Sequence, residues 1–225
     1  MGIDIGPIET TDALAISFDT GNIRSYPGSG TSVIGLVSGI GFTLNNGVGF
    51  GTTGTNYFIL DGTNDNIPFY VPNVGTTVTV EMWAKIRAFS GGMPFGFNLY
   101  DVWTANGAMG FNTAVSDQYG LTSTQVTNLG LLNQWKHYIF EMRSDVAYTN
   151  NKIYINAVNQ SLSQVAGAEN ASNRNFNSGN GRISSWLFSD SFFIRMDLAQ
   201  FQVYNRALSA TEIFQNYNAT KGRYK

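Results

Sequence analysis

An acidic turn near residue 61 is the first place where residue types and spacing suggest chemistry. Asp61, Asn64 and Asp65 lie within the segment Asp61-Gly-Thr-Asn-Asp65. Carboxylate and amide oxygens are ligands that Ca²⁺ prefers, so the segment predicts calcium binding by these three side chains. The alternative is that Asp61 and Asn64 hydrogen-bond the backbone of their own turn, as Asp and Asn commonly do. We favour this alternative, and we expect no other cofactor.

Three aromatic side chains in polar surroundings are candidates for carbohydrate binding. Trp103, Tyr119 and Trp186 lie in or beside stretches rich in Gly, Asn and Ser. An aromatic ring offers an apolar platform, and neighbouring amides and hydroxyls can hydrogen-bond a ligand. The alternative for each ring is packing within the domain. Trp83 and Trp135 lie within strand patterns, and we expect them to pack against a sheet.

The acidic and histidine residues do not indicate catalysis. His137 is the only histidine, and we expect it to lie in a strand and to bond the sheet or Glu141. Retaining hydrolysis of a glycosidic bond needs two carboxyl groups about 5 Å apart. Glu81 stands alone on its strand, and Met-Arg-Ser separates Glu141 from Asp145. We therefore predict no catalytic residues and no enzymatic activity.

Alternating apolar residues predict that strands position these side chains. Every even position of 77–86 is apolar, as expected for a strand with one face in the core. The runs 135–143 and 152–156 predict a hairpin with a long loop. Ala199, Phe201 and Val203 alternate with polar residues and tyrosine near the end of the chain. Short strands without intervening helices favour an antiparallel sandwich.

One helix is predicted over residues 210–220. Ser209 and Glu212 have the spacing of a capping box, and Leu208 and Ile213 have that of a hydrophobic staple. We expect Ile213 to pack against the sandwich, together with Tyr217 or Phe214. Two stretches rich in glycine and small polar residues, 88–128 and 158–182, are predicted to be elaborated loops of the kind that often carry function.

Composition limits the class of protein. The chain has 225 residues, 43% hydrophobic and 14% aromatic, which predicts one packed domain over 1–225 with 1–12 as an extended N-terminal segment. The net charge of −2 without a basic stripe argues against nucleic acid as a partner. We find no signal peptide and no apolar run of about 18 residues, so we expect no membrane span. The lack of cysteine excludes disulfides.

Several short segments, in order along nearly the whole chain, match one known pattern. They are Phe18-Asp19, Ser25–Gly30, Tyr57–Asp65, Val80–Trp83, Asn133–Tyr138, Asn151–Asn156 and Val203–Ile213. Together they resemble the concanavalin A-like lectin/glucanase superfamily, specifically its laminin-G-like jelly rolls. Asn66 and Ala157 depart from that pattern. The resemblance implies an all-β fold, an antiparallel β-sandwich of roughly a dozen strands, here with one short C-terminal helix.

The resemblance also bears on the site. Laminin-G-like domains often carry calcium at a rim, whereas the Glu-x-Asp-x-(x)-Glu motif of the glucanases is missing here. Asp197 occupies the family's acidic position before the last strand, and we expect it to accept backbone N–H bonds rather than bind metal. A fold alone does not determine function.

The expected function follows from the phage-borne members of the superfamily, which 25–30 and 203–213 resemble. We expect a non-enzymatic bacteriophage virion surface protein, either a capsid decoration or a fibre- or tail-associated module. Its expected partners are other virion proteins, in multiple copies, and cell-surface glycans. Its expected location is the virion, after synthesis in the host cytoplasm. The alternative is a free carbohydrate-binding lectin with a rim calcium site.

Overall fold

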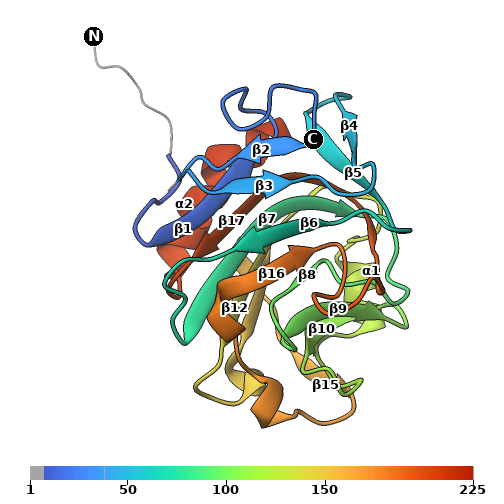
Figure 1. The fold of residues 1–225 in the computed structure, drawn as a ribbon. Helices are drawn as coiled ribbons and strands as arrows, with labels where there is room; N and C mark the ends of the chain where they lie inside the picture. The colour runs from blue at the N-terminus through green and yellow to red at the C-terminus, as the bar shows by residue number, and fades with distance from the viewer. Residues whose placement is uncertain (1–7, 38, 225) are drawn as a thin grey trace.

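Two antiparallel β-sheets pack face to face in the computed structural model of the chain, which describes residues 8–37 and 39–224 (Figure 1). The eight-stranded sheet has β1 (Leu14–Asp19) beside β17. Its other strands follow the order β14 (Val158–Asn159), β13 (Lys152–Ile155), β12 (Lys136–Arg143), β7 (Thr77–Ile86), β17 (Arg195–Tyr204), β5 (Tyr57–Asp61) and β4 (Gly49–Gly51).

The seven-stranded sheet forms the second layer. Its strands follow the order β15 (Ser163–Ala166), β11 (Gln118–Leu121), β10 (Ala108–Asn112), β9 (Asp101–Ala105), β8 (Phe95–Gly96), β16 (Asn180–Ile183) and β6 (Ile67–Tyr70). A separate ribbon pairs β2 (Ser32–Ile34) with β3 (Gly41–Thr43). The described helices are α1 (Ser123–Asn128) and α2 (Ala210–Thr220), with 3₁₀ turns at Tyr148–Asn150, Ala171–Asn173, Asn177–Gly179 and Lys221–Arg223. The all-β antiparallel sandwich and its C-terminal helix are confirmed; α1 was not predicted.

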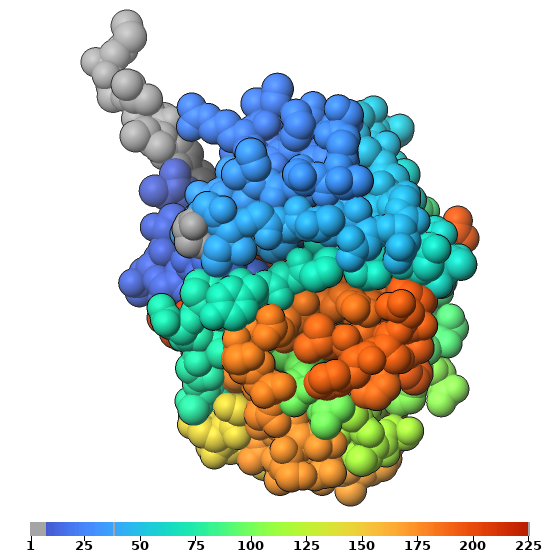
Figure 2. All heavy atoms as spheres, in the orientation of Figure 1, coloured from blue at the N-terminus to red at the C-terminus, as the bar shows by residue number. Residues whose placement is uncertain are grey.

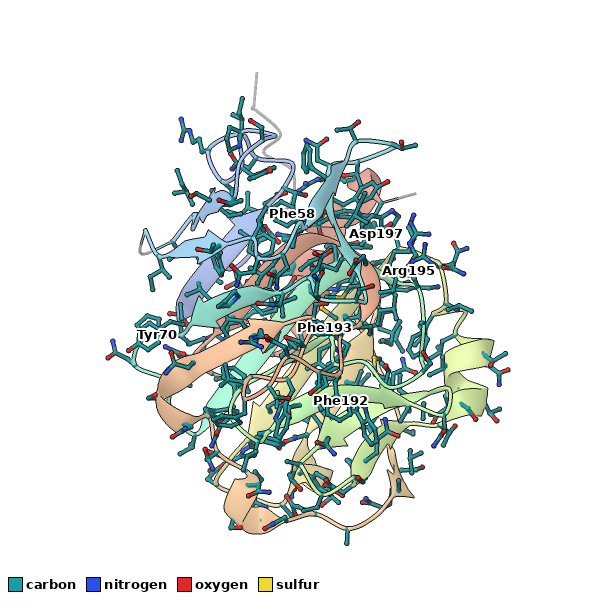
Figure 3. All side chains as sticks on the ribbon, turned by 45° about the vertical axis from the view of Figure 1, so that its right-hand side comes forward. Phe58, Tyr70, Phe192, Phe193, Arg195 and Asp197 are labelled. Atoms are coloured by element: carbon teal, nitrogen blue, oxygen red, sulfur yellow. The ribbon has the colours of Figure 1, made fainter. Side chains whose placement is uncertain are left out.

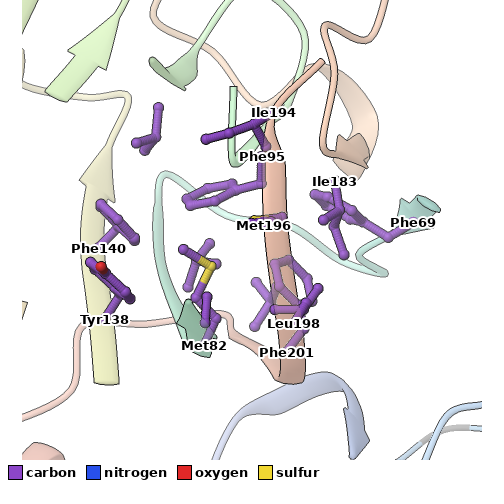
Figure 4. Close-up of a cluster of buried hydrophobic side chains, with 14 of the residues drawn as sticks. Phe69, Met82, Phe95, Tyr138, Phe140, Ile183, Ile194, Met196, Leu198 and Phe201 are labelled. Atoms are coloured by element: carbon purple, nitrogen blue, oxygen red, sulfur yellow. The ribbon is translucent and has the colours of Figure 1, made fainter. Parts of the chain in front are cut away.

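The hydrophobic core lies between the two sheets (Figure 4). The alternation predicted for β7 is confirmed, because each of its even-numbered residues is fully buried on the core side. Aromatic rings connect the layers: Phe95 of β8 lies 5.2 Å from Phe140 of β12 and 6.1 Å from Phe201 of β17, measured between ring centroids. These contacts fix the position of the seven-stranded sheet, whose other face carries the candidate site.

Helix α2 covers the outer face of the eight-stranded sheet. Its capping box joins Ser209 and Glu212 as predicted, and both staple residues are buried. Ile213 is 1% exposed and Tyr217 packs against the cluster around Trp83, whereas Phe214 is 59% exposed. The second residue of α2 that packs against the sandwich is therefore Tyr217. Trp83 lies beneath the end of the helix, where its indole N–H donates to Thr220 at 2.8 Å. Trp83 therefore packs against a sheet, as expected.

Strand β17 contains a β-bulge that the sequence pattern did not reveal. Its register against β7 shifts just after Leu198. Because a bulge adds one residue to a strand, Leu198 and Phe201 both lie in the core, and Ala199 packs with Trp83 and Tyr224 on the outer face. The predicted alternation of Ala199 with Phe201 on one face was therefore wrong.

The prediction of long loops at 88–128 and 158–182 was wrong where strands and a helix run through these stretches, and right for the irregular chain between β15 and β16. The first stretch holds β8, β9, β10, β11 and α1, and the second holds β14, β15 and β16. Most of the seven-stranded sheet therefore comes from segments that resemble loops in composition.

The described part of the predicted N-terminal segment, residues 8–12, lies against α2 and β17. The Thr10 N–H donates to Asn216 at 2.8 Å, and the Tyr204 hydroxyl donates to the Thr10 carbonyl at 3.0 Å. The Gln215 amide donates to the Ile8 carbonyl at 2.6 Å. Residues 1–7 of that segment lie outside the described residues.

Candidate functional site

An aromatic pocket lies on the outer face of the seven-stranded sheet. It is an open hollow of about 150 Å³, lined by Met93, Trp103, Asn112, Ala114, Ser116, Trp186 and Phe192. Figure 2 shows this face, with the orange atoms of the chain after β16 beside green atoms of the neighbouring strands. Sites for drug-sized ligands usually enclose about 300–1,000 Å³, so this pocket suits a single small ring.

Trp103 forms one wall of the aromatic pocket. Successive residues of β9 point to opposite faces of the sheet. Val102 is therefore buried in the core, while Trp103 is half-buried on the outer face. The Trp103 indole N–H donates to the Gly91 carbonyl at 3.1 Å, which holds the ring in place. Trp103 thus lies in a strand, and not in the loop that the sequence suggested.

The opposite wall comes from the chain between β16 and β17. The Phe192 ring lies 6.4 Å from Trp103 at 87° and 6.1 Å from Trp186 at 78°, both edge-on. Phe192 has a φ of 57°, an unusual value for a bulky residue. Its carbonyl accepts the Met93 N–H at 2.8 Å, which ties this conformation to the segment just before β8. Figure 3 shows Phe192 in front of the green strands.

The polar side of the aromatic pocket comes from the turn after β10. Asp117 is buried and accepts hydrogen bonds from the Thr113 N–H at 2.8 Å, the Thr113 hydroxyl at 2.7 Å and the Asn112 amide at 3.2 Å. The Asn112 side-chain oxygen, Oδ1, accepts the Ala114 N–H at 2.9 Å. These bonds brace the turn, and the exposed Ser116 lies at the rim.

The structure brings together two of the three predicted aromatic residues. Trp103 and Trp186 both line the aromatic pocket, whereas Tyr119 lies on β11 and stacks on Tyr148 at 5.5 Å. Sequence reasoning missed Phe192. The pair Phe192-Phe193 in a Ser-rich stretch could have pointed to it. That pair instead looks like the start of a buried strand, whereas Phe192 is 43% exposed.

The acidic turn at 61–65 is held by its own hydrogen bonds. The Asp61 carboxylate accepts the N–H groups of Thr63 at 2.7 Å and Asn64 at 3.4 Å. Burial opposes ionisation of Asp61, but these backbone bonds outweigh it and lower its pKa. Asp65 accepts the Asp61 N–H at 3.0 Å, and burial raises the Asp65 pKa. Within residues 8–37 and 39–224, no three acidic or histidine side chains are grouped as ligands of one metal ion. Calcium binding by Asp61, Asn64 and Asp65 remains a prediction.

His137 has one of its two expected partners, whereas Asp197 does not have the partners expected. His137 lies in β12 and bonds the neighbouring strand of the sheet, because its Nε2 is 2.7 Å from Glu81 of β7. The Asp197 carboxylate accepts hydrogen bonds from the Arg87 guanidinium, and not from backbone N–H groups as expected. Both His137 and Glu81 are 0% exposed, so neither side chain is accessible to a substrate in this structure.

The two antiparallel sheets and the helix after β17 define a lectin-like jelly roll. Residues 60–214 match the model of a laminin-G family within the concanavalin A-like lectin/glucanase superfamily. The chain belongs to this superfamily, as the resemblance implied. No curated protein sequence matches the chain.

Solved structures with a similar fold include two neurotoxin domains and a sialidase. The receptor-binding domain of a botulinum neurotoxin C/D mosaic serotype is 12% identical with a TM-score of 0.63, over 92% of this chain and 51% of that chain. The botulinum neurotoxin serotype D ligand-binding domain in complex with N-acetylneuraminic acid is 12% identical with a TM-score of 0.62, over 93% of this chain and 51% of that chain.

The sialidase of Trypanosoma rangeli in complex with sialic acid gives 11% identity and a TM-score of 0.65, over 96% of this chain and 34% of that chain. This chain thus spans about half of the neurotoxin domains and a third of the sialidase. At these identities, the likeness concerns the fold alone. Among the described residues, no helix combines the length and the apolar character needed to cross a membrane.

Proposed function

We propose that this chain is a non-catalytic module that binds glycans through the aromatic pocket. The observation that carries the proposal is the meeting of Trp103 of β9 with Trp186 and Phe192 of the chain between β16 and β17, beside the exposed hydroxyl group of Ser116. Sugar rings have apolar C–H faces that pack on aromatic rings, and hydroxyl edges that need hydrogen-bonding partners. The pocket offers both.

A glycan array probed with the purified protein tests this proposal. We expect binding that Trp103→Ala and Phe192→Ala each weaken about tenfold or more, because each removes an aromatic wall. Tyr119→Phe is the matched control, since Tyr119 lies outside the pocket. Thermal melting of each variant establishes that it is folded. Unchanged binding by the two folded pocket variants would refute this site.

The absence of catalysis is part of the proposal. Near the aromatic pocket, the carboxyl groups of Asp101 and Asp117 are both 0% exposed, and Asp117 is fully engaged by its turn. Glycoside hydrolysis needs one acid and one base or nucleophile, both in contact with the substrate. We therefore expect no hydrolysis of any glycan that binds, as measured by release of reducing ends.

The proposed setting is a phage virion surface, as a capsid decoration or a fibre- or tail-associated module. The likeness of 25–30 and 203–213 to phage-borne jelly rolls supports it. We expect the protein to co-sediment with particles in multiple copies and to appear in virion mass spectra. Failure to do both would contradict this setting and leave the glycan site untouched.

The alternative is a free lectin with calcium at the turn 61–65. The buried Asp65 oxygen that has no partner among the described residues favours this alternative. A glycan array with and without a chelator separates the two, because only the calcium lectin loses its signal when calcium is removed.

A further inference from the structure

The aromatic pocket has three ring walls that meet at steep angles. Trp103 meets Phe192 at 87°, and Trp186 meets Phe192 at 78°. Phe188 also contacts Trp186 edge-on, at 81°. None of the three walls is therefore stacked face to face on another described ring. Rings that meet at right angles form adjoining sides of an enclosure rather than a stack, and the Met93 side chain lines the same enclosure.

The side chains that line the aromatic pocket offer a ligand few hydrogen-bonding partners. The Trp103 indole N–H is bonded to a backbone carbonyl, and the Asn112 amide donates to Asp117. The Trp186 indole N–H is buried. The exposed hydroxyl of Ser116 remains. A group with several donors or acceptors would lose its hydration here without replacing it, so the group that enters the pocket should need few hydrogen bonds.

The charges beside the aromatic pocket favour a cation. Asp117 braces the turn that lines the pocket and has no ion-pair partner among the described residues. Arg182, which donates to the Trp186 carbonyl, is paired with Asp190 at 3.0 Å. The described cation–π contacts of the chain involve four other rings, those of Tyr57, Trp135, Tyr217 and Tyr224. No described lysine or arginine therefore occupies the aromatic pocket.

A quaternary ammonium group matches this combination of aromatic walls, few polar partners and unbalanced negative charge. It carries methyl groups around its nitrogen and has no N–H, so it needs no hydrogen-bond acceptor. Aromatic rings attract such a cation when it lies over their faces within about 6 Å of the ring centroid. The hollow of about 150 Å³ admits a group of this compact shape.

We propose that the aromatic pocket holds a quaternary ammonium group of the choline type, carried as a substituent on the glycan. This inference rests on the proposed function and names its class of ligand. The sugar to which the substituent is attached lies at the mouth of the pocket, where its hydroxyl groups stay hydrated. Phe192 and Ser116 are exposed there and are available to the sugar.

Titration with three small molecules tests the charge and the methyl groups separately. Choline has both. Dimethylbutanol, in which carbon replaces the nitrogen, keeps the shape without the charge, and ethanolamine keeps the charge but has N–H groups in place of methyl groups. Calorimetry should show that choline binds more tightly than either analogue, by about tenfold. Equal affinities for choline and dimethylbutanol, or no binding of choline, overturn the inference.

Phe192→Leu tests the aromatic wall itself. Leucine keeps an apolar side chain but has no ring face, so the ratio of choline affinity to dimethylbutanol affinity should fall by about threefold or more. Phe214→Leu is the matched control, because Phe214 is 59% exposed, against 43% for Phe192, and lies on α2. Thermal melting establishes that both variants are folded. An unchanged affinity ratio in folded Phe192→Leu overturns the inference.

Ser116→Lys tests the charge preference at an exposed position. A lysine at the rim repels a cation, so choline should bind about threefold or more weakly, and the loss should shrink as salt is added. The loss for dimethylbutanol should be smaller and independent of salt. Equal, salt-independent losses for the two molecules overturn the inference.

A glycan array separates this inference from the proposed function. It presents the same oligosaccharides in three forms: unsubstituted, with phosphoethanolamine and with phosphocholine. We expect the phosphocholine form to bind about tenfold more tightly than the other two, and free choline to displace it. Equal binding of the three forms, without displacement by choline, overturns this inference alone. Binding of no glycan in any form overturns the proposed function, and this inference with it.

Discussion

At the scale of single residues, the interface between α2 and the eight-stranded sheet holds an acidic cluster with few charges to balance it. Glu81 is fully buried between His137 and Asn216, each 2.7 Å from one of its oxygens. Glu9 lies nearby and accepts the amides of Gln200 at 2.6 Å and Gln202 at 3.2 Å. Burial, and next the proximity of Glu81, raise the pKa of Glu9 to about 7.

The raised pKa of Glu9 predicts that stability depends on pH. Between the ordinary pKa of 4.5 and about 7, the folded protein keeps a proton that the unfolded chain has released. Rising pH in this window therefore favours unfolding. The contribution of the protonated Glu9 to the free energy of unfolding is fully present below pH 4.5 and is lost above about pH 7. Glu9→Gln should remove this loss, so its stability relative to wild type rises by up to about 3 kcal/mol from pH 4.5 to 8.

Urea unfolding of wild type and Glu9→Gln across that pH range measures the difference. Both proteins share every other titrating group, so the difference between their curves isolates Glu9. Parallel curves would show that Glu9 titrates normally in the folded protein.

At the scale of elements, the sequence predicted best where one face is buried and the other is regular. Strand β7 follows its alternating pattern, and α2 follows its cap and staple. Strand β10 escaped notice because all five of its residues are buried, which leaves no alternation. Gly110 and Gly120 look like turn signals, but a Cβ on Gly110 would lie 2.5 Å from the Tyr119 carbonyl oxygen. These glycines allow close approach of two strands.

Only part of the candidate site can be predicted from patterns within single segments of the sequence. Trp103 and Trp186 stand out as tryptophans in polar surroundings. The lateral alignment of Asp101 of β9, Gly96 of β8 and Arg182 of β16, by contrast, depends on strand register. Residues far apart in the chain become neighbours only through pairing, and no spacing pattern within one segment records it.

The cap of α2 predicts a measurable loss of stability at the element scale. Ser209 accepts the Glu212 N–H at 3.3 Å, and the Glu212 carboxylate accepts the Ser209 N–H at 2.8 Å. Ser209→Ala removes one half of this exchange and should destabilise the protein by about 1 kcal/mol in urea unfolding. Ser209→Thr keeps a hydroxyl at the cap, so its loss of stability should be clearly smaller than that of Ser209→Ala. Equal losses in the two variants would mean that the cap bond is not the cause.

At the scale of the whole molecule, the sheets and the chain ends are interlocked. The first described strand, β1, pairs with the last strand, β17, which also pairs with β7 and β5. Arg223 near the C-terminus forms an ion pair with Asp19 at 2.6 Å. Phe95 joins the seven-stranded sheet to rings of the eight-stranded sheet. Neither sheet can bury its core face without the other, so we expect one cooperative unit.

Tryptophans on the two sheets can test this cooperativity. Trp83 lies on the eight-stranded sheet, and Trp135, directly before β12, packs against the same cluster. Trp103 and Trp186 line the aromatic pocket on the other sheet. Replacing either pair by Phe leaves fluorescence that reports on one sheet. In each variant the fluorescence and far-ultraviolet circular dichroism transitions in urea should coincide, because a two-state domain loses all its structure together. If the Trp103 and Trp186 signal changed at lower urea than circular dichroism in the same protein, the seven-stranded sheet would be a separate unit and the single-domain prediction would be wrong.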